Sequence, residues 1–264
     1  MTGLRRALRR PAAAVGLALA ATLAITGLLV SRQPASAGGD LQARGRQLYL
    51  TGCVSCHGTH GEGVVGPDGR RRGPSLQQSG EAGAYYYLST GRMPLGSSSD
   101  QPRRKKRAYE GTDLQALVAY VASLGTGPAA PLVDVRAGDL ARGGEIYRAN
   151  CQACHSASGS GGVLSYGRAA PSLHKAEPRE IAAAMRTGPG QMPVFAPRQI
   201  GGRDLDSVVR YVRYLRNPRD PGGLPIGRIG PIPEGFVAWS VGMVALLGMV
   251  AWIGTRSPIR RRAP

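Results

Sequence analysis

The chain has 264 residues, including 39 glycines, 20 prolines and two phenylalanines. This composition predicts two small, loop-rich domains rather than one large hydrophobic core. The formal net charge is +18, but nine of the 34 basic residues flank apolar runs at the two ends, so 25 basic residues remain against 16 acidic ones. An excess of nine, without interleaved aromatic residues, argues against nucleic acid as a partner.

The first element is an apolar run of twenty residues, Pro11 to Val30, that carries no charge. Arg9 and Arg10 precede it, and basic residues in this place keep the amino end in the cytoplasm and direct the following chain outward. The triplet Ala35-Ser36-Ala37 is typical of a signal-peptidase site, whereas twenty apolar residues are also enough to span a membrane. We therefore assign residues 1–37 to a signal peptide or an N-terminal membrane anchor, and both alternatives export the rest of the chain.

The next feature is Cys53-Val54-Ser55-Cys56-His57, which recurs as Cys151-Gln152-Ala153-Cys154-His155. Cys-x-x-Cys-His is the attachment signature of c-type haem, in which two thiolates form thioether bonds with the porphyrin and the histidine binds the iron. The two copies use all four cysteines of the chain. The sequence thus predicts two covalently bound haem c groups in an exported protein, a compartment that suits this cysteine usage.

Three other uses of the cysteines stay open at this point, namely disulfides, zinc sites and thioredoxin-like dithiols. A Cys-x-x-Cys disulfide is a tight redox loop rather than a structural crosslink. Zinc needs four ligands at suitable spacings, which two cysteines and a histidine within five residues serve poorly. A thioredoxin-like dithiol belongs to an alternating strand and helix pattern, which this chain lacks.

The surroundings of the motif repeat as well, which predicts two tandem domains of similar fold. Met93-Pro94 recurs 99 residues later as Met192-Pro193, and the last apolar helix recurs 91 residues later. The first domain therefore has about eight extra residues after its methionine, and these include the basic run Arg103 to Arg107. Three further landmarks recur at 97 or 98 residues: Tyr49 as Tyr147, His57 as His155, and Pro74 as Pro171.

Apolar spacing predicts a helix at each end of the first domain. Leu41, Leu48 and Tyr49 share one face of a helix that leads into the motif, and Thr112 is the expected N-cap of the closing helix. The glycine-rich residues 58–73 are expected to form a loop. The closing helices of the two domains carry apolar residues at the same spacing: Leu114, Leu117, Val118, Val121 and Leu124, then Leu205, Val208, Val209, Val212 and Leu215.

Residues 218–234 are rich in proline and glycine and are expected to form an extended connector. The following residues, Phe236 to Ile253, carry no charge, and Trp239 and Trp252 lie near their ends, which is typical of a membrane span. A buried core helix is the alternative. We assign residues 235–255 to a transmembrane helix in contact with lipid, and the basic residues 256–264 to a cytoplasmic tail.

The landmarks of both domains resemble those of class I cytochrome c domains, at residues 38–128 and 138–217 with a linker at residues 129–137. The resemblance implies a mainly α fold in which Cys53, Cys56, Cys151 and Cys154 hold the haems. It also implies that His57 and His155 are the proximal iron ligands, with Met93 and Met192 as the distal ones. The carbonyls of Pro74 and Pro171 would orient the two histidines. With methionine in the sixth position, each iron would pass electrons without binding a substrate.

Two other side chains compete for the role of Met192. Met185 shares an apolar face with Ile181 and has no counterpart in the first domain, which favours a packing role. His174 is a possible distal ligand, although the first domain has Gln77 at the equivalent place. The run Arg103 to Arg107 is either a solvated loop or a docking site.

The whole arrangement resembles the dihaem cytochrome c subunit of the actinobacterial-type menaquinol:cytochrome c reductase, a cytochrome bc complex. The resemblance implies that the cytochrome b and Rieske iron–sulfur subunits are partners, and that electrons leave for a haem-copper oxidase held in a supercomplex. It further implies an electron-transfer subunit of a translocase, without a catalytic site of its own, whose haem domains face outward from the plasma membrane. A free-standing anchored dihaem shuttle and a dihaem peroxidase are the alternatives, and the sequence leaves open which haem faces the Rieske centre.

Overall fold

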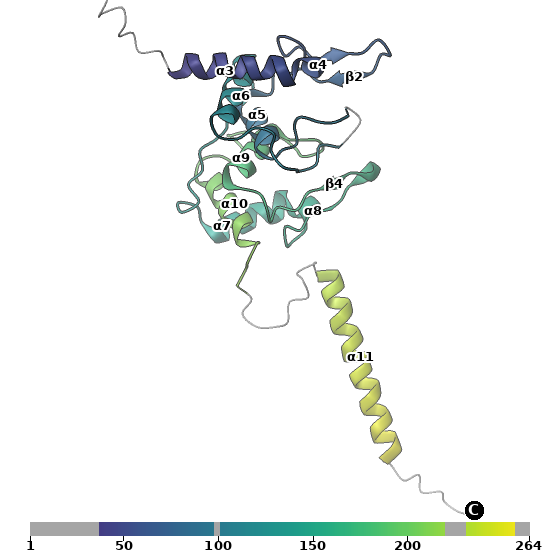
Figure 1. Cartoon of the computed structure of the whole chain (residues 1–264). Helices are drawn as coiled ribbons and strands as arrows, with labels where there is room; N and C mark the ends of the chain where they lie inside the picture. The colour runs from purple at the N-terminus through teal and green to yellow at the C-terminus, as the bar shows by residue number, and fades with distance from the viewer. Residues whose placement is uncertain (1–36, 98–100, 220–230, 257–264) are drawn as a thin grey trace, which may run out of the picture.

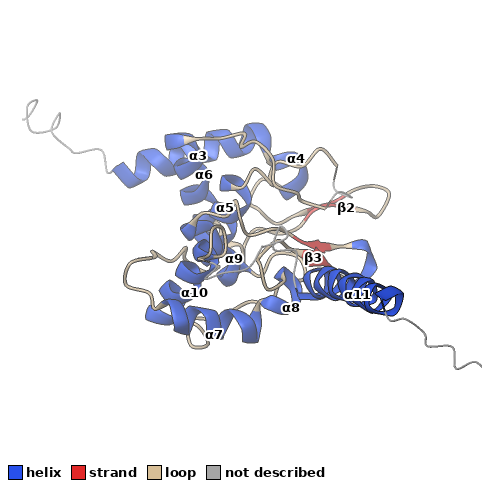
Figure 2. Cartoon of the chain, turned by 90° about the horizontal axis from the view of Figure 1, so that it is seen from below, coloured by secondary structure: helices blue, strands red, loops and turns tan. Residues whose placement is uncertain are grey.

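The computed structural model describes residues 37–97, 101–219 and 231–256, and it shows two helical units and a long helix, α11 (Figure 1). The predicted signal or anchor segment up to residue 36, residues 220–230 of the connector and the basic tail 257–264 lie outside these ranges. Within the described residues, the strands form two short hairpins and helices make up most of the remaining regular structure (Figure 2). The predicted mainly α, tandem architecture is thereby confirmed.

The two units contain the same elements in the same order. Each has a first helix, a short helix that ends at the motif histidine, an antiparallel hairpin, a middle helix and a last helix. The first unit comprises α3 (Ala37–Gly52), α4 (Val54–His57), β1 (Val64–Val65), β2 (Arg71–Gly73), α5 (Gly80–Ser89) and α6 (Gly111–Ser123). The second comprises α7 (Leu140–Asn150), α8 (Gln152–His155), β3 (Gly162–Val163), η1 (Ser165–Gly167), β4 (Ala169–Ala170), α9 (Pro178–Thr187) and α10 (Arg203–Tyr214).

The first and last helices of each unit approach each other at a glycine. A Cβ atom added to Gly45 of α3 would lie 2.0 Å from the carbonyl oxygen of Ala116 in α6. One added to Gly143 of α7 would likewise lie 2.0 Å from the carbonyl oxygen of Ser207 in α10. Since neither position has room for a side chain, glycine is what lets the two backbones touch.

Matching ion pairs flank the two contacts. Arg44 donates to both carboxylate oxygens of Asp113, at 2.9 and 3.2 Å. Arg142 does the same with Asp204, at 3.1 and 3.0 Å. Exposed ion pairs contribute little to stability, but their recurrence shows that the two units fold alike.

Each unit has its own apolar core, with a tyrosine of the first helix at its centre. Tyr49 and Tyr147 are both 0% exposed. Their hydroxyls donate to the carbonyl that follows the motif, that of Gly58 at 2.6 Å and that of Ser156 at 2.7 Å. The predicted apolar faces of α6 and α10 pack into these cores, so that the motif is tied to the most buried part of each unit.

Two local expectations are wrong. Helix α6 begins at Gly111 with Glu110 as its N-cap, so Thr112 lies inside the helix. Gly111 has a φ of +53°, a conformation that glycine tolerates and that starts the helix earlier than the polar side chain suggested. Residues 58–73 are not loop throughout, because β1 pairs with β2 there. Strands of two or three residues are too short to leave an alternating pattern in the sequence.

The two units meet through their middle helices, α5 and α9 (Figure 1). Arg179 of α9 donates to Glu81 of α5 at 2.7 Å, and its guanidinium carbon lies 4.3 Å from the centre of the Tyr85 ring. Glu81 and Arg179 stand 98 residues apart, at equivalent positions of the repeat, so the two helices face each other in an approximately two-fold arrangement. The buried residues of this contact are mostly small: Ala82, Tyr86, Ala130, Ala183 and Ala184.

Helix α11 (Pro231–Arg256) is long and apolar enough to cross a membrane. Within Ile232–Arg256, an 18-residue stretch has a mean hydropathy of 2.1, and none of that stretch is buried within the described structure. At about 1.5 Å per residue such a helix is longer than the roughly 30 Å hydrocarbon core of a bilayer. A core helix would be buried, so the exposure of α11 favours the membrane alternative.

Candidate functional site

The two motif histidines have equivalent positions and equivalent partners. His57 ends α4, and His155 ends α8. Nδ1 of His57 lies 2.8 Å from the carbonyl oxygen of Pro74, and Nδ1 of His155 lies 3.0 Å from that of Pro171. Because a carbonyl only accepts, Nδ1 must donate, and Nε2 keeps its lone pair for a metal.

A glycine turn holds the proline segment close to each motif. The backbone N–H of Gly63 donates to the carbonyl of His57 at 2.8 Å, and that of Gly161 donates to the carbonyl of His155 at 3.1 Å. Both glycines have positive φ values, +87° and +93°, where a side chain would be strained. A Cβ atom on Gly63 would also lie 2.8 Å from the backbone nitrogen of Ser75. The turn therefore fixes the distance between each histidine and its carbonyl partner.

Burial shifts the pKa values of several motif side chains. It raises the pKa of Cys53 and of Cys151 to about 11, and the second cysteine of each motif adds to the shift. It lowers the pKa of His155, against the smaller opposing effect of the hydrogen bond to Pro171. Iron binds the neutral form of imidazole. A redox-active dithiol instead uses a cysteine of lowered pKa, which is opposite to the direction of the shift at Cys53 and Cys151.

The other two uses of the cysteines are not supported either. All four cysteines are free, half-buried at the first position of each motif and exposed at the second. Across the described ranges, no three His, Cys, Asp or Glu side chains are grouped so that they could hold a metal ion. Zinc sites need such a group.

The two methionines of the Met-Pro pairs are partly buried against the apolar cores. Met93 packs on the core of the first unit, and Met192 packs on that of the second and on the cluster between the units. Thioether sulfur is apolar and polarisable, so it can lie in such a place and still bind iron.

The two competitors of Met192 are engaged elsewhere. Met185 is 2% exposed and belongs to the core of the second unit. Nε2 of His174 lies 2.8 Å from the carbonyl oxygen of Ser158, in the loop that follows the second motif. Met192 remains the candidate for the distal position.

The side chains of each unit suit a covalently bound haem. Each unit offers two free thiols on one turn of chain, an imidazole whose Nε2 is available, and a thioether against an apolar core. The first unit would hold a haem by Cys53, Cys56, His57 and Met93. The second would hold one by Cys151, Cys154, His155 and Met192.

Residues 103–107 of the basic run are exposed, and one of them, Arg104, reaches the second unit. Nη2 of Arg104 lies 2.5 Å from Oε2 of Glu180 in α9, whose side chain is 3% exposed. Lys105 turns back on its own unit, where Nζ donates to the carbonyl of Pro94 at 2.5 Å. The pairing of Arg104 with Glu180 was not predicted from the sequence, because the two residues are 76 positions apart. The unmatched eight-residue insertion was the one signal that could have pointed to it.

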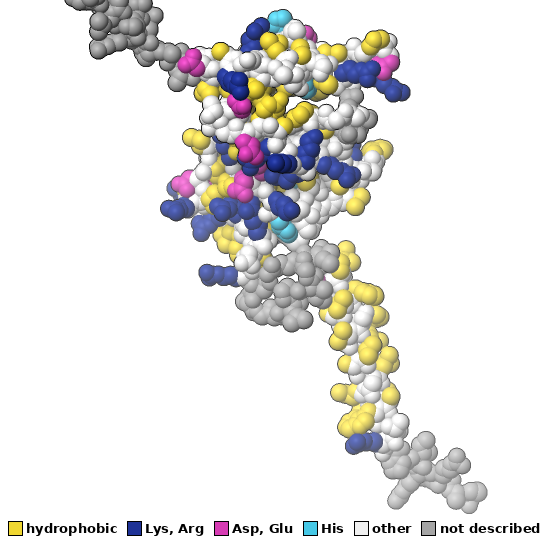
Figure 3. Space-filling view, in the orientation of Figure 1, with side chains coloured by type: hydrophobic (Ala, Val, Ile, Leu, Met, Phe, Trp, Pro, Cys, Tyr) yellow, Lys and Arg dark blue, Asp and Glu magenta, His cyan; other side chains and the backbone are white. Residues whose placement is uncertain are grey.

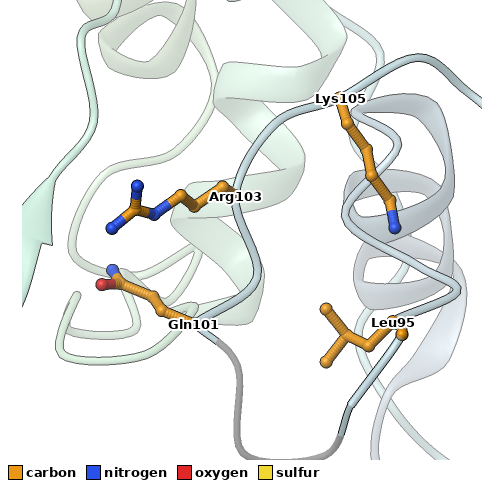
Figure 4. Close-up of a pocket in the computed structure, with 5 residues that line it drawn as sticks. Leu95, Gln101, Arg103 and Lys105 are labelled. Atoms are coloured by element: carbon orange, nitrogen blue, oxygen red, sulfur yellow. The ribbon is translucent and has the colours of Figure 1, made fainter.

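A cavity of about 410 Å³ lies beside the basic run, lined by Leu95, Gly96, Gln101, Arg103 and Lys105. Gln101 and Arg103 point toward the ribbon of the second unit, whereas Lys105 points toward Leu95 (Figure 4). The amide of Gln101 donates to the carbonyl of Ala169 in β4 at 3.4 Å. In the view of Figure 3, several Lys and Arg side chains lie over the middle of the two units, with Asp and Glu side chains among them.

Comparison with known proteins agrees with this geometry. Residues 42–125 match the family model described as cytochrome c, and residues 138–212 match that of the cytochrome c oxidase, cbb3-type, subunit III. The cytochrome bc1 complex cytochrome c subunit of Mycobacterium leprae is 40% identical over 258 residues, which cover 92% of this chain and 88% of that protein. Proteins of the same name share 42% identity in Mycobacterium tuberculosis, over 81% of this chain and 77% of the relative, and 36% in Corynebacterium efficiens, over 96% and 92%.

The matches cover both helical units and extend over most of the chain. The two units are therefore cytochrome c domains, whose cofactor is covalently bound haem c. This chain belongs to the family of cytochrome bc1 complex cytochrome c subunits.

Proposed function

We propose that the chain is the membrane-anchored dihaem cytochrome c of a quinol-oxidising bc complex. One haem c binds in each unit, and electrons pass from the Rieske iron–sulfur centre through both haems to a haem-copper oxidase. The observation that carries this proposal is the repeated hydrogen bond between the motif histidine and a proline carbonyl. Both units are equally equipped for a haem, and two haems in one chain form a relay that needs no diffusing carrier.

Each side chain of the proposed sites has a defined task. The cysteines fix the haem to the chain, and the carbonyls of Pro74 and Pro171 hold the proximal rings in one tautomer and orientation. The thioether sulfurs of Met93 and Met192 would bind the iron of a haem held in each unit and would raise its reduction potential. The bound haem supplies one-electron chemistry, whereas the chain supplies its orientation and its apolar surroundings. This arrangement gives no reason to expect a substrate site in the chain itself.

We assign residues 38–128 and 138–217 to the haem domains, 129–137 to the linker and 218–234 to the connector. Residues 235–255 span the membrane, the tail 256–264 is cytoplasmic, and residues 1–37 are a signal peptide or a second anchor. The haem domains then face outward from the plasma membrane. Partners in this arrangement are the cytochrome b and Rieske subunits, the haem-copper oxidase and membrane lipid.

Haem content and quinol oxidation together test the proposal. The purified chain should contain two covalent haems by pyridine haemochrome assay, and His57→Ala and His155→Ala should each lose one. His60→Ala and His174→Ala are matched controls that should keep both. One haem or none in the parent would refute the assignment.

The relay itself is tested by oxygen consumption of the purified assembly with a menaquinol analogue. Met93→His and Met192→His keep six ligands but lower the potential of one haem, so each should slow turnover while the haem content stays at the parental value. Parental turnover in either variant would refute the tandem path. A parent that needs added soluble cytochrome c would instead be a free-standing shuttle or an ordinary reductase subunit.

A further inference from the structure

Arg92 is a buried guanidinium with an unsatisfied donor. It directly precedes Met93 and is 6% exposed. Its guanidinium carbon lies 4.8 Å from the centre of the Tyr86 ring, and the buried Nη1 has no hydrogen-bond partner within the ranges that the structure describes. A buried charge needs a counter-ion and hydrogen-bond partners, or it costs several kcal/mol.

The nearly buried carboxylate of α9 already has other partners. The side chain of Glu180 is 3% exposed. Its two oxygens accept hydrogen bonds from Arg104, and Oε2 also accepts one from the backbone N–H of Glu177. The hydrogen bonds to Glu180 thus come from Arg104 and Glu177, and the described residues supply no carboxylate partner for the buried Nη1 of Arg92.

A bound haem supplies negative charge in this place. Each haem has two propionate carboxylates on its rim. Consecutive Cα atoms are about 3.8 Å apart, so a haem whose iron binds Met93 passes close to Arg92. Guanidinium is well matched to a carboxylate, because its N–H donors form a fixed fork.

We propose that Arg92 binds a propionate carboxylate of a haem at the boundary between the two units. This inference rests on the proposed binding of haem iron by Met93. The carboxylate comes from the haem of the first unit or from that of the second, since Met192 also packs against the cluster between the units. In either case the bond occupies the free Nη1 and neutralises the buried charge.

The two units differ at this position. Gln191 precedes Met192 in the second unit, as Arg92 precedes Met93 in the first, so it is the equivalent residue of the repeat. Gln191 is exposed and uncharged. A nearby positive charge disfavours ferric haem, so Arg92 raises the reduction potential of the haem that it binds. Arg92 thereby makes the two haems of the relay unequal.

Arg92→Gln in the full-length chain removes the charge while keeping a polar side chain. We expect the ratio of oxidised to reduced haem at a fixed potential to rise about tenfold for one haem, which lowers its midpoint by about 59 mV for one electron. The propionate-bending mode in the resonance Raman spectrum should also shift, and Arg92→Lys should restore part of both effects. Redox titrations repeated in a Met192→His background, where the second haem has a low potential, assign the change to one haem.

Two control variants separate this role from general effects of charge. Arg103→Gln removes an exposed cation of the basic run Arg103 to Arg107 and should leave the propionate mode unchanged. Asp100, outside the described residues, is the acidic residue nearest to Arg92 in the sequence. If it were the counter-ion, Arg92→Gln would leave the propionate mode unchanged and Asp100→Asn would destabilise the chain as much as Arg92→Gln does.

An unchanged propionate mode and midpoint in Arg92→Gln would overturn the proposed role of Arg92. Haem content and the methionine–iron absorption band of the same samples test the proposed haem sites separately. Loss of part of that band in Met93→Ala shows that Met93 binds the iron of one haem, whatever the result for Arg92.

Discussion

Gly45 and Gly143 mark the points where the first and last helices of each unit touch, since a Cβ atom at either would lie 2.0 Å from a carbonyl oxygen of the facing helix. In Gly45→Ala the two helices must move apart. We expect the free energy of unfolding to fall by about 1–3 kcal/mol, although alanine alone favours a helix over glycine by up to about 1 kcal/mol. Thermal unfolding followed by circular dichroism measures the change.

Gly96→Ala is the matched control for this substitution, because a Cβ atom there meets nothing within 4 Å. Gly143→Ala should repeat the loss in the second unit. If Gly45→Ala and Gly96→Ala had the same midpoint of unfolding, the close helix contact would not be what the glycine serves.

At the scale of residues, the sequence indicates the side chains of the proposed haem sites more readily than the contacts around them. The cysteines and histidines lie within five residues, and the prolines repeat at a fixed distance, so local spacing is enough to find them. The pairing of Arg104 with Glu180 joins residues 76 apart. Nothing in a basic run indicates which distant carboxylate it meets, so this contact becomes visible only when α5 and α9 are in place.

At the scale of elements, the packing of α5 against α9 depends on small side chains. Ala183 is 0% exposed within this contact. In Ala183→Leu the larger side chain has no space, so we expect the two units to separate and their unfolding to split into two transitions. Differential scanning calorimetry of the full-length chain measures this, and the covalent haem content should stay at the parental value because no motif residue changes.

Ala141→Leu places the same side chain on the exposed surface of α7 and should leave the unfolding profile unchanged. A parental profile in Ala183→Leu would show that α5 and α9 do not join the units. Splitting in both variants would point to a general effect of leucine.

The helices that the sequence predicts are those with one apolar face. α6 and α10 bury a stripe of leucine and valine and expose the opposite side, which is the pattern that periodicity detects. α5 buries residues on several sides, many of them Gly or Ala, because it lies between its own unit and α9. A helix buried on several sides has no polar face to reveal its period, and so the contact between the units could not be predicted.

At the scale of the whole molecule, α11 is the element that would fix the two cytochrome c domains to one side of a membrane in the proposed arrangement. Its side chains are exposed along an apolar stretch with a mean hydropathy of 2.1. Lipid can surround such a helix, because its backbone N–H and C=O groups are hydrogen-bonded within the helix itself. Arg256, with its guanidinium carbon 4.5 Å from the centre of the Trp252 ring, marks the end of the span. Arg260, Arg261 and Arg262 follow in the sequence, and a cluster of this kind stays on the cytoplasmic side.

This orientation predicts the outcome of proteolysis on intact cells whose wall has been removed. Protease added outside should digest both haem domains and spare a tag placed after Pro264, because the bilayer shields the tail. Detergent should make the tag accessible, which controls for its intrinsic resistance to the protease.

Replacement of Leu246 and Leu247 by lysine puts two charges in the middle of α11, at a cost of about 2.5–3.5 kcal/mol each, and should release the chain from alkali-washed membranes. Lysine at Val237, near the end of the helix, should be tolerated, because its amine can reach the interface. Loss of the tag without detergent would reverse the orientation and place the haems on the wrong side of the membrane for the proposed electron path.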